Sequence, residues 1–342
     1  MSIQMMKAVQ QYAFGEPDVL RYEDVPVPDV LPDEVLVRVQ AVGFNPPDGY
    51  LRDGYRMLPP EWQPEVSFPL ILGTDVSGVI TAVGDKVKDF SVGDEVYSMV
   101  RFPEGAAGGS RASAEYVNVA ATEIARKPRN LDHIHAAAVP MSLLTAWQFL
   151  IEQGHEVPNP LQPNPHQPVP LAGKTVLVNG AAGGVGHLVV QLAKWQGAHV
   201  IAVGSGRHEA FLRRLGADAF IDYTKQAAEE VVRNVDLVVD AVGGPSTGRF
   251  LPALRRGGAL FPVFPLGFTG AEEARQLGVT VSTTQVRSSG AQLAQLATLL
   301  DEGVIQVAVD STFPLADAQQ AHERAARGHI QGKIVLAVSN PA

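Results

Sequence analysis

Apolar residues in the first third of the chain recur in short runs with the spacing of β-strands. From Lys7 to about Val119, runs such as Val35–Val39 and Val76–Val83 are separated by turns rich in glycine, proline and aspartate. Runs of this length between such turns are typical of an all-β region. Two Gly-Asp pairs, beginning at Gly84 and Gly93, predict tight hairpins within one irregular sheet or barrel.

The pattern changes near Asp132, where helical spacing begins and leads into a helix over Leu143–Leu150. Six short apolar strands then alternate with helical or loop segments, at Val176–Val178, Val200–Val203, Ala219–Ile221, Leu237–Asp240, Ala259–Phe264 and Val279–Val281. This alternation predicts an α/β doubly wound parallel sheet. A helix over Gly290–Glu302 follows, and the chain returns to β texture at Lys333–Val338. The proline-rich segment 154–170 is expected to be a surface loop or an extended connector.

A glycine-rich stretch joins the first two of these strands. Gly183 and Gly186 occupy the second and third glycine positions of a G-x-G-x-x-G turn, and Ala181 stands at the first. The stretch precedes an amphipathic helix, whose N-terminus would attract a phosphate. We therefore expect a dinucleotide-binding site, with contacts from the turn residues Gly180, Ala182, Gly183, Gly184, Val185 and Gly186.

The second strand ends in a segment that favours NADPH over NADH. NAD-specific sites usually place an acid here to bind the ribose hydroxyls, whereas this chain reads Val203-Gly204-Ser205-Gly206-Arg207. Ser205 can donate a hydrogen bond and Arg207 can bind a phosphate with two of its N–H groups. Both residues are candidates for binding the 2′-phosphate of NADPH.

Composition narrows the choice of partner. The formal net charge is −9, and no run of Lys and Arg exceeds a pair such as Arg255-Arg256, which argues against nucleic acid or an anionic membrane as partner. The chain has no cysteine, so thiolate nucleophiles, disulfides and cysteine zinc sites are excluded. No run of eighteen apolar residues occurs, and we expect a cytoplasmic protein that acts on a small metabolite.

Several motifs in order resemble one family. The turn at Ala181–Gly186, Leu215-Gly216-Ala217-Asp218, Asp240-Ala241-Val242-Gly243-Gly244 and the closing Gly332-Lys333-Ile334-Val335-Leu336 are similar to the medium-chain dehydrogenase/reductase superfamily. More narrowly, the chain resembles the zinc-free quinone oxidoreductase branch. This resemblance implies a GroES-like catalytic domain from residues 1–130 and 304–342, with a Rossmann domain inserted at 131–303. It also implies a homodimer or homotetramer.

The resemblance extends to individual residues of the cofactor site. It implies that Tyr223 lies near the 2′-phosphate of NADPH. It further implies cofactor contacts from Thr145, Val242, Phe264 and Lys333.

The segments that hold the catalytic zinc in zinc-using relatives have lost their ligands here. Asn45 stands where the first cysteine would be and Thr74 where the histidine would be, and Met141 or Ser142 falls in the third segment. Zinc prefers thiolate and imidazole donors, so we expect no metal site. The resemblance implies that Asn45 and Tyr50 are the catalytic polar groups, while Tyr55 and Arg101 are weaker candidates for lining the site.

Without a Lewis acid, alcohol oxidation lacks its usual means of stabilising an alkoxide. Hydride transfer to a quinone or an α,β-unsaturated carbonyl needs only orientation and one donor to the developing enolate oxygen. The leading hypothesis is therefore an NADPH-dependent reductase of quinones, enones or enals. Two alternatives are a reductase of enoyl thioesters and an NADPH-binding redox sensor without turnover.

Overall fold

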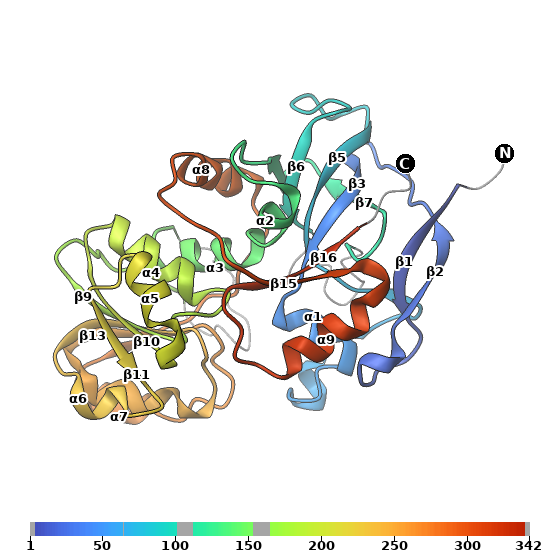
Figure 1. Ribbon diagram of the computed structural model, residues 1–342. Helices are drawn as coiled ribbons and strands as arrows, with labels where there is room; N and C mark the ends of the chain where they lie inside the picture. The colour runs from blue at the N-terminus through green and yellow to red at the C-terminus, as the bar shows by residue number, and fades with distance from the viewer. Residues whose placement is uncertain (1–3, 64, 101–111, 153–164, 339–342) are drawn as a thin grey trace. The chain divides into compact units, whose positions relative to one another are not determined.

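The protein is represented by a computed structural model (Figure 1), in which the described residues are 4–63, 65–100, 112–152 and 165–338. The chain forms two compact units, one of residues 1–144, 287–303 and 307–342 and the other of residues 145–286 and 304–306. Helices α2 (His133–Ala137) and α8 (Gly290–Asp301) fall in the first unit. The domain limits expected from the sequence, at 131 and 303, stay a prediction.

The first unit is built around β3 (Glu34–Gly43), which pairs with three neighbouring strands. Its larger sheet has the order β15-β16-β3-β5-β6-β8, with β7 paired to β3, and a smaller sheet has the order β2-β1-β4. The strands are β1 (Met5–Gln11), β2 (Arg21–Pro26), β4 (Leu70–Ile71), β5 (Asp75–Val83), β6 (Glu95–Met99), β7 (Tyr116–Ala120), β8 (Ile124–Arg126), β15 (Val309–Pro314) and β16 (Lys333–Ala337).

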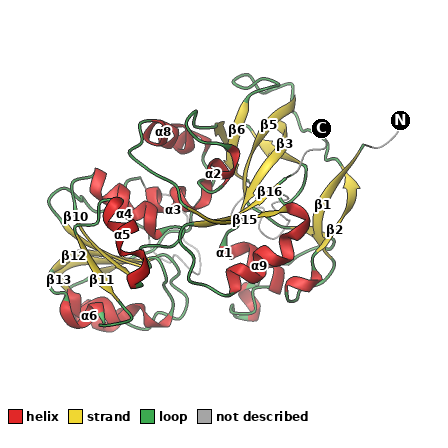
Figure 2. Ribbon diagram, in the orientation of Figure 1, coloured by secondary structure: helices red, strands yellow, loops and turns green. Residues whose placement is uncertain are grey.

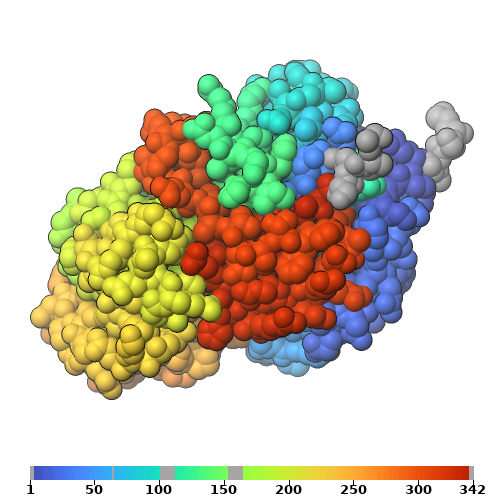
Figure 3. Space-filling model, in the orientation of Figure 1, coloured from blue at the N-terminus to red at the C-terminus, as the bar shows by residue number. Residues whose placement is uncertain are grey.

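The two ends of the chain meet in this unit. Strand β16 pairs antiparallel with β3, with Val335 opposite Gly43, so the last strand extends a sheet formed by the first part of the chain. On one face of this unit, the red C-terminal residues lie directly beside the blue N-terminal ones (Figure 3). The inward side chains of these strands are mostly valine and leucine, and they form one buried cluster. Leu315, just before helix α9 (Ala318–Ala326), and Ala321, within that helix, also belong to this cluster.

One prediction about turns is wrong. Both Gly-Asp pairs lie in the single connection between β5 and β6, so they do not form two separate hairpins. Gly93 has a positive φ of 95°, as a tight turn requires, and its N–H donates to the carbonyl of Ile80. The two turns therefore shape one long loop of an antiparallel pair.

The second unit is a six-stranded parallel sheet in the order β11-β10-β9-β12-β13-β14, as the sequence predicts. Helices α4 and α5 lie on one face and α6 and α7 on the other (Figure 1), and Figure 2 shows the yellow strands between the red helices. The strands are β9 (Thr175–Asn179), β10 (His199–Gly204), β11 (Ala219–Asp222), β12 (Val235–Asp240), β13 (Leu254–Pro262) and β14 (Thr280–Val281). The helices are α4 (Gly186–Trp195), α5 (Glu209–Arg214), α6 (Ala228–Val231) and α7 (Ala271–Leu277).

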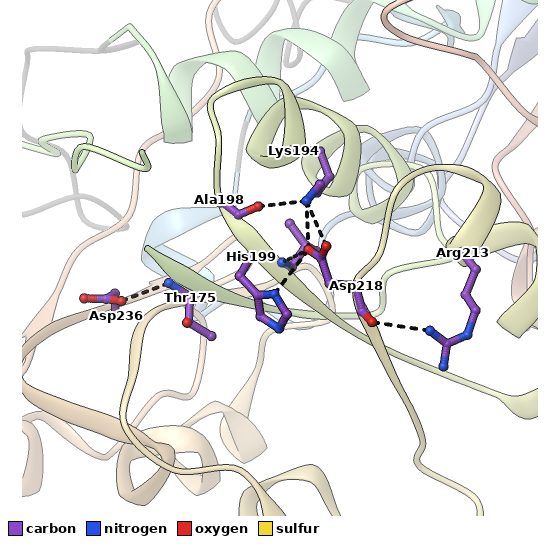
Figure 4. Close-up of polar contacts among 8 residues, drawn as sticks. Thr175, Lys194, Ala198, His199, Arg213, Asp218 and Asp236 are labelled. Carbon is purple, nitrogen blue, oxygen red and sulfur yellow. Dashed lines mark hydrogen bonds and ion pairs between the residues drawn. The ribbon is translucent and has the colours of Figure 1, made fainter. Parts of the chain in front are cut away.

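Two carboxylates hold the beginnings of these strands in register (Figure 4). Asp218, just before β11, accepts a hydrogen bond from the backbone N–H of Val200 at 2.7 Å and pairs with Lys194 of α4 at 2.9 Å. Asp236 in β12 accepts from the N–H of Thr175 at the start of β9, at 2.9 Å. Because each carboxylate bonds the backbone of a neighbouring strand, a slip of one residue would break these contacts.

The described end of the proline-rich segment is not wholly a surface loop. His166 is fully buried, with its ring 4.5 Å from that of Phe261. Its Nε2 donates to the carbonyl of Phe149 and its Nδ1 contacts the hydroxyl of Ser282, both at 2.9 Å. Burial lowers the pKa of His166, so the ring is neutral at pH 7. This histidine therefore anchors the segment in the core of the second unit.

Candidate functional site

The glycine-rich turn has the backbone geometry that a dinucleotide site requires. Gly180 adopts a φ of 69°, and the N–H of Gly183 donates to its carbonyl at 3.0 Å. A Cβ at Gly186 would lie 2.2 Å from that same carbonyl oxygen, so only glycine lets α4 begin so close to β9. A Cβ at Gly183 would lie 3.4 Å away, an ordinary contact. Glycine at position 183 is therefore not required by the fold.

Around the start of helix α4, the N–H groups of Gly184, Val185 and Gly186 have no backbone acceptor among the described residues, whereas those of His187 and Leu188 donate to the carbonyls of Gly183 and Val185. No side chain caps the helix, whose N-cap residue is Val185. The unbonded N–H groups of a first helical turn and the positive end of the helix dipole attract an anion. The predicted contacts Gly180, Ala182, Gly183, Gly184, Val185 and Gly186 all lie in or directly before this first turn.

The three residues predicted to bind the 2′-phosphate come together in the second unit. Ser205 and Arg207 follow β10, and Tyr223 follows the neighbouring parallel strand β11, with its N–H bonded to the carbonyl of Gly204 at 3.2 Å. Arg207 is exposed, and its Nε donates to Nε2 of the buried His208 at 3.0 Å. The phenol of Tyr223 is half exposed.

An acidic residue that the sequence analysis did not consider, Asp222, lies beside the proposed 2′-phosphate site. Asp222 ends β11, and a Cβ at Gly206 would lie 2.4 Å from its carboxylate. The hydroxyl and N–H of Thr224 bond this carboxylate and Lys225 pairs with it at 3.3 Å, and these contacts lower the pKa of Asp222. Asp222 could have been singled out from the sequence, because it follows the apolar run Ala219–Ile221, which was expected to form a strand of the same sheet as Val200–Val203.

Val242 and Phe264 meet at the same edge of the sheet, after β12 and β13. The N–H of Gly244 donates to the carbonyl of Phe264 at 2.8 Å, and Val242 is exposed. Asp240, at the end of β12, accepts a hydrogen bond from the Asn179 side chain of β9 at 2.7 Å. In open α/β sheets, ligands bind outside the carboxyl ends of the strands where the strand order reverses, which here lies between β9 and β12.

Thr145 is buried in helix α3 (Pro140–Leu150). Its predicted cofactor contact stays a prediction, as do those of the residues at the edge of the sheet.

In the first unit, Asn45 and Thr74 lie side by side in a buried polar network. Asn45 precedes helix α1 (Pro46–Asp53), and its Nδ2 donates to Oγ1 of Thr74 at 3.0 Å and to Oδ2 of Asp75 at 2.9 Å. Its Oδ1 accepts a hydrogen bond from the Nζ of Lys333, which also lies 3.8 Å from the Asp75 carboxylate. The amide of Asn45 therefore uses both donors and its oxygen within the protein.

Asp48 closes the network on the other side. Its two oxygens accept hydrogen bonds from the backbone N–H of Asn45 at 2.7 Å and of Gly73 at 3.2 Å. Burial raises the pKa of Asp48 to about 7, against the lowering effect of these two bonds. The N–H of Met141 donates to Asp75 at 2.9 Å, and burial raises the pKa of Asp75 to about 6 although Lys333 and Asn45 oppose it.

Lys333 is the cation of this network. Burial lowers the pKa of Lys333, whereas the nearby carboxylates of Asp75 and Asp48 raise it. The sequence analysis placed Lys333 in the cofactor site, and its ammonium lies against Asn45 and Asp75 instead of projecting into solvent. The cofactor contact of Lys333 stays a prediction.

The donor set at the metal-ligand positions does not suit zinc. Asn45 and Thr74 offer an amide and a hydroxyl there, and the Lys333 ammonium that bonds Asn45 offers no lone pair to a metal. Over the described ranges of the chain, no group of three His, Cys, Asp or Glu residues is placed to hold a metal ion. Asp48 and Asp75 complete this network, and the sequence analysis did not identify either as part of the site.

Tyr50 lies in α1, one turn beyond the network. Burial raises the pKa of its phenol, so the group keeps its proton near neutral pH. Its ring centre is 6.1 Å from that of Tyr55, which adopts a positive φ of 53°. The catalytic role of Tyr50 stays a prediction, and Arg101 lies outside the described residues.

Two family models match the chain, the alcohol dehydrogenase GroES-like domain over residues 31–129 and the zinc-binding dehydrogenase over residues 215–336. The mouse protein named NAD(P)H oxidoreductase RTN4IP1, mitochondrial, is 33% identical, with 95% of this chain and 87% of that protein covered. The Arabidopsis thaliana NADPH-dependent alkenal/one oxidoreductase, chloroplastic, is 32% identical over 97% of this chain and 79% of its own length.

Solved structures agree with the sequence relatives. The quinone oxidoreductase of Coxiella burnetii has a TM-score of 0.83 at 31% identity, covering 98% of this chain and 100% of that one. The Escherichia coli quinone oxidoreductase complexed with NADPH has a TM-score of 0.80 at 27% identity, covering 97% and 99%. Among the described residues, no helix is long and apolar enough to cross a membrane. The chain belongs to the quinone oxidoreductase-like branch of the medium-chain dehydrogenase/reductase superfamily.

Proposed function

We propose that the protein is a zinc-independent, NADPH-dependent oxidoreductase that reduces quinones or α,β-unsaturated carbonyl compounds. The observation that carries this proposal is the buried network that Asn45 and Thr74, at two of the expected zinc-ligand positions, form with Asp75 and Lys333. Without a metal to stabilise an alkoxide, the site is poorly suited to alcohol oxidation. An acceptor that is already electrophilic needs only orientation and hydrogen-bond donors at its oxygen. The buried network around Asn45 and the phenol of Tyr50 are the proposed source of these donors.

The carboxyl edge of the parallel sheet would hold NADPH, which supplies a hydride when bound. Backbone N–H groups from Gly184 to Gly186 would bind the pyrophosphate. Ser205, Arg207 and Tyr223 would bind the 2′-phosphate, with the charge of Asp222 compensated by Lys225 and Thr224. The names of the alkenal/one oxidoreductase and of the NADPH-bound quinone oxidoreductase support the same cofactor.

A panel of acceptors tests the proposal. The purified protein is mixed with NADPH and with benzoquinone, hexenal or crotonyl-CoA in turn, and the loss of NADPH absorbance is followed. Turnover of the quinone or the alkenal supports the proposal, whereas turnover of crotonyl-CoA alone would indicate an enoyl-thioester reductase. Tight NADPH binding without turnover of any acceptor would indicate a redox sensor. A cytoplasmic location and a homodimeric or homotetrameric state are part of the same proposal.

A further inference from the structure

Three groups of the buried network form a chain of hydrogen bonds that all point the same way. The ammonium of Lys333 can only donate, so the oxygen of Asn45 must face it. The amide nitrogen of Asn45 then faces Oδ2 of Asp75 and Oγ1 of Thr74, at 2.9 and 3.0 Å. The chemistry of the partners therefore fixes which way the amide is turned. Donation runs from Lys333 to Asn45 and from Asn45 to Thr74.

The chain of donors ends at the hydroxyl of Thr74. Its oxygen accepts from Asn45, and its own proton finds no acceptor in the part of the chain that the structure describes. Thr74 is only 3% exposed, and other buried hydroxyls of this unit are satisfied: Ser77 and Ser98 donate to the carbonyls of Val96 and Glu123 at 3.0 and 2.7 Å. A buried donor without an acceptor is costly, so this hydroxyl calls for a partner that the described residues do not provide.

The positive charge of Lys333, where this series of hydrogen bonds begins, strengthens the Thr74 hydroxyl as the donor where it ends. Hydrogen bonds in series polarise one another, and the effect grows where the surroundings are apolar and water is excluded. Lys333 draws electron density from the amide of Asn45, which in turn draws it from the Thr74 oxygen. Asp75 pairs with Lys333 and accepts the second amide proton, so its carboxylate favours the charged ammonium and aligns the amide.

We propose that Thr74 is the catalytic hydrogen-bond donor to the acceptor's carbonyl oxygen, and that Asn45 and Lys333 are positioning residues that act through it. The proposal rests on the proposed function and names the group that does the work of the absent Lewis acid. When a hydride adds to the β carbon of an enone, the π electrons shift and negative charge develops on the oxygen. Thr74 stabilises that charge and keeps its proton, and the enolate takes its proton from water.

Two substitutions at position 74 separate hydrogen bonding from packing. Thr74→Val removes the hydroxyl and keeps the shape of the side chain, whereas Thr74→Ser keeps the hydroxyl. With cyclohexenone as the acceptor, Thr74→Val should lower kcat/KM by about a hundredfold to a thousandfold, as for loss of one oxyanion donor. Thr74→Ser should restore most of this loss. If Thr74→Val fails to fold by circular dichroism, Thr74→Ala replaces it in the same comparison.

A second readout does not depend on turnover. The infrared carbonyl stretch of carbonyl-labelled cyclohexenone is recorded in the complex with the protein and oxidised cofactor. Loss of a hydrogen bond at the oxygen should move this stretch to higher wavenumber in Thr74→Val and leave it in place in Thr74→Ser. The double variant Lys333→Met with Asp75→Asn, which keeps the charge balanced, should give an intermediate shift because Thr74 remains without its polarising cation.

Equal rates and equal carbonyl frequencies in the wild type and Thr74→Val would overturn the proposal. Equal impairment of Thr74→Val and Thr74→Ser would also overturn it, because it would assign the residue to packing. If the wild type reduces no acceptor of the panel, the proposed function fails, and the carbonyl stretch still decides whether Thr74 donates to a bound carbonyl. The two failures are therefore distinguishable.

Discussion

At the scale of single residues, the fold retains a carboxyl group that is costly to ionise. Asp48 is buried, accepts hydrogen bonds from the backbone N–H groups of Asn45 and Gly73, and has a pKa raised to about 7. In the unfolded chain an aspartate titrates near 3.9. Because the folded pKa is raised, this group contributes stability that is fully present below about pH 4 and is lost as the pH rises through about 7.

Asp48→Asn should therefore change the pH dependence of stability. Between pH 5 and 7.5, the unfolding free energy of the wild type should fall relative to that of the variant by about 2–3 kcal/mol. Urea denaturation of both proteins at the two pH values measures this change. The titration of the buried histidines affects both proteins equally, so it cancels when the variant is compared with the wild type. Asp218→Asn is the control, since hydrogen bonds from Val200 and Lys194 outweigh burial and lower the pKa of Asp218, so its effect appears only below about pH 4. A constant difference between the wild type and Asp48→Asn would contradict the account.

Arg207→Ala should weaken the binding of NADPH by about tenfold to a hundredfold, because a charged hydrogen bond contributes roughly 1.5–3 kcal/mol. The affinity for NADH should remain nearly unchanged, since that cofactor lacks the 2′-phosphate. Fluorescence titration of both cofactors measures the effect. The matched control is Arg213→Ala, which removes an exposed arginine of α5 that pairs with Glu209 at 2.9 Å. Equal losses for both cofactors would show that Arg207 does not contact the phosphate.

Part of the network around Asn45 could be predicted from the sequence, and part could not. Asn45 and Thr74 could be singled out because their segments match metal-binding segments of relatives. That Lys333 contacts Asn45 could not be predicted, because it depends on the register of two antiparallel strands. Val335 pairs with Gly43, and this register places Lys333 level with Asn45, 288 residues away in the chain. No local pattern specifies such a register before the sheet is assembled.

At the scale of elements, two glycines of the turn between β9 and α4 have different roles: Gly186 is needed for folding, and Gly183 is expected to matter for cofactor binding. Gly186→Ala should destabilise the protein strongly, because its Cβ would lie 2.2 Å from the carbonyl oxygen of Gly180. Gly183→Ala should leave stability within about 1 kcal/mol of the wild type and weaken NADPH binding, because backbone at that position approaches the pyrophosphate. Thermal denaturation and cofactor titration of both variants measure the two effects. Tight NADPH binding by a stable Gly183→Ala protein would place the pyrophosphate elsewhere.

The elements themselves were largely predictable. Each of the six parallel strands overlaps its expected run, because strands buried in a parallel sheet are short apolar runs that can be recognised without their partners. Strand β13 nevertheless begins at Leu254, before the expected start at Ala259, and ends at Pro262. The burial of His166 was not predictable, since a proline-rich stretch carries no periodic signal and the histidine packs against Phe261, far away in the chain. The loop between β5 and β6 was misjudged because a Gly-Asp pair marks a turn without saying which strands it joins.

At the scale of the whole molecule, we expect a protein that works without zinc. Protein purified without added metal should contain far less than one zinc per chain, and a chelator should leave its fold and activity unchanged. The reason is the donor set of Asn45, Thr74, Asp75 and Lys333, in which an ammonium contributes to the network where a metal would need a ligand. Metal analysis and activity assays after chelation provide the test. Near-stoichiometric zinc that is lost together with activity would contradict this expectation.

The central claim is that a hydride passes from NADPH to an electrophilic acceptor. The most direct measurement is the reduction of cyclohexenone with NADPH deuterated at the carbon that gives up the hydride, followed by mass spectrometry of the product. The account predicts a saturated ketone that carries one deuterium on its β carbon, formed in equal amount to the NADPH consumed. A product without deuterium, or bound NADPH that persists unoxidised with cyclohexenone and benzoquinone alike, would contradict it.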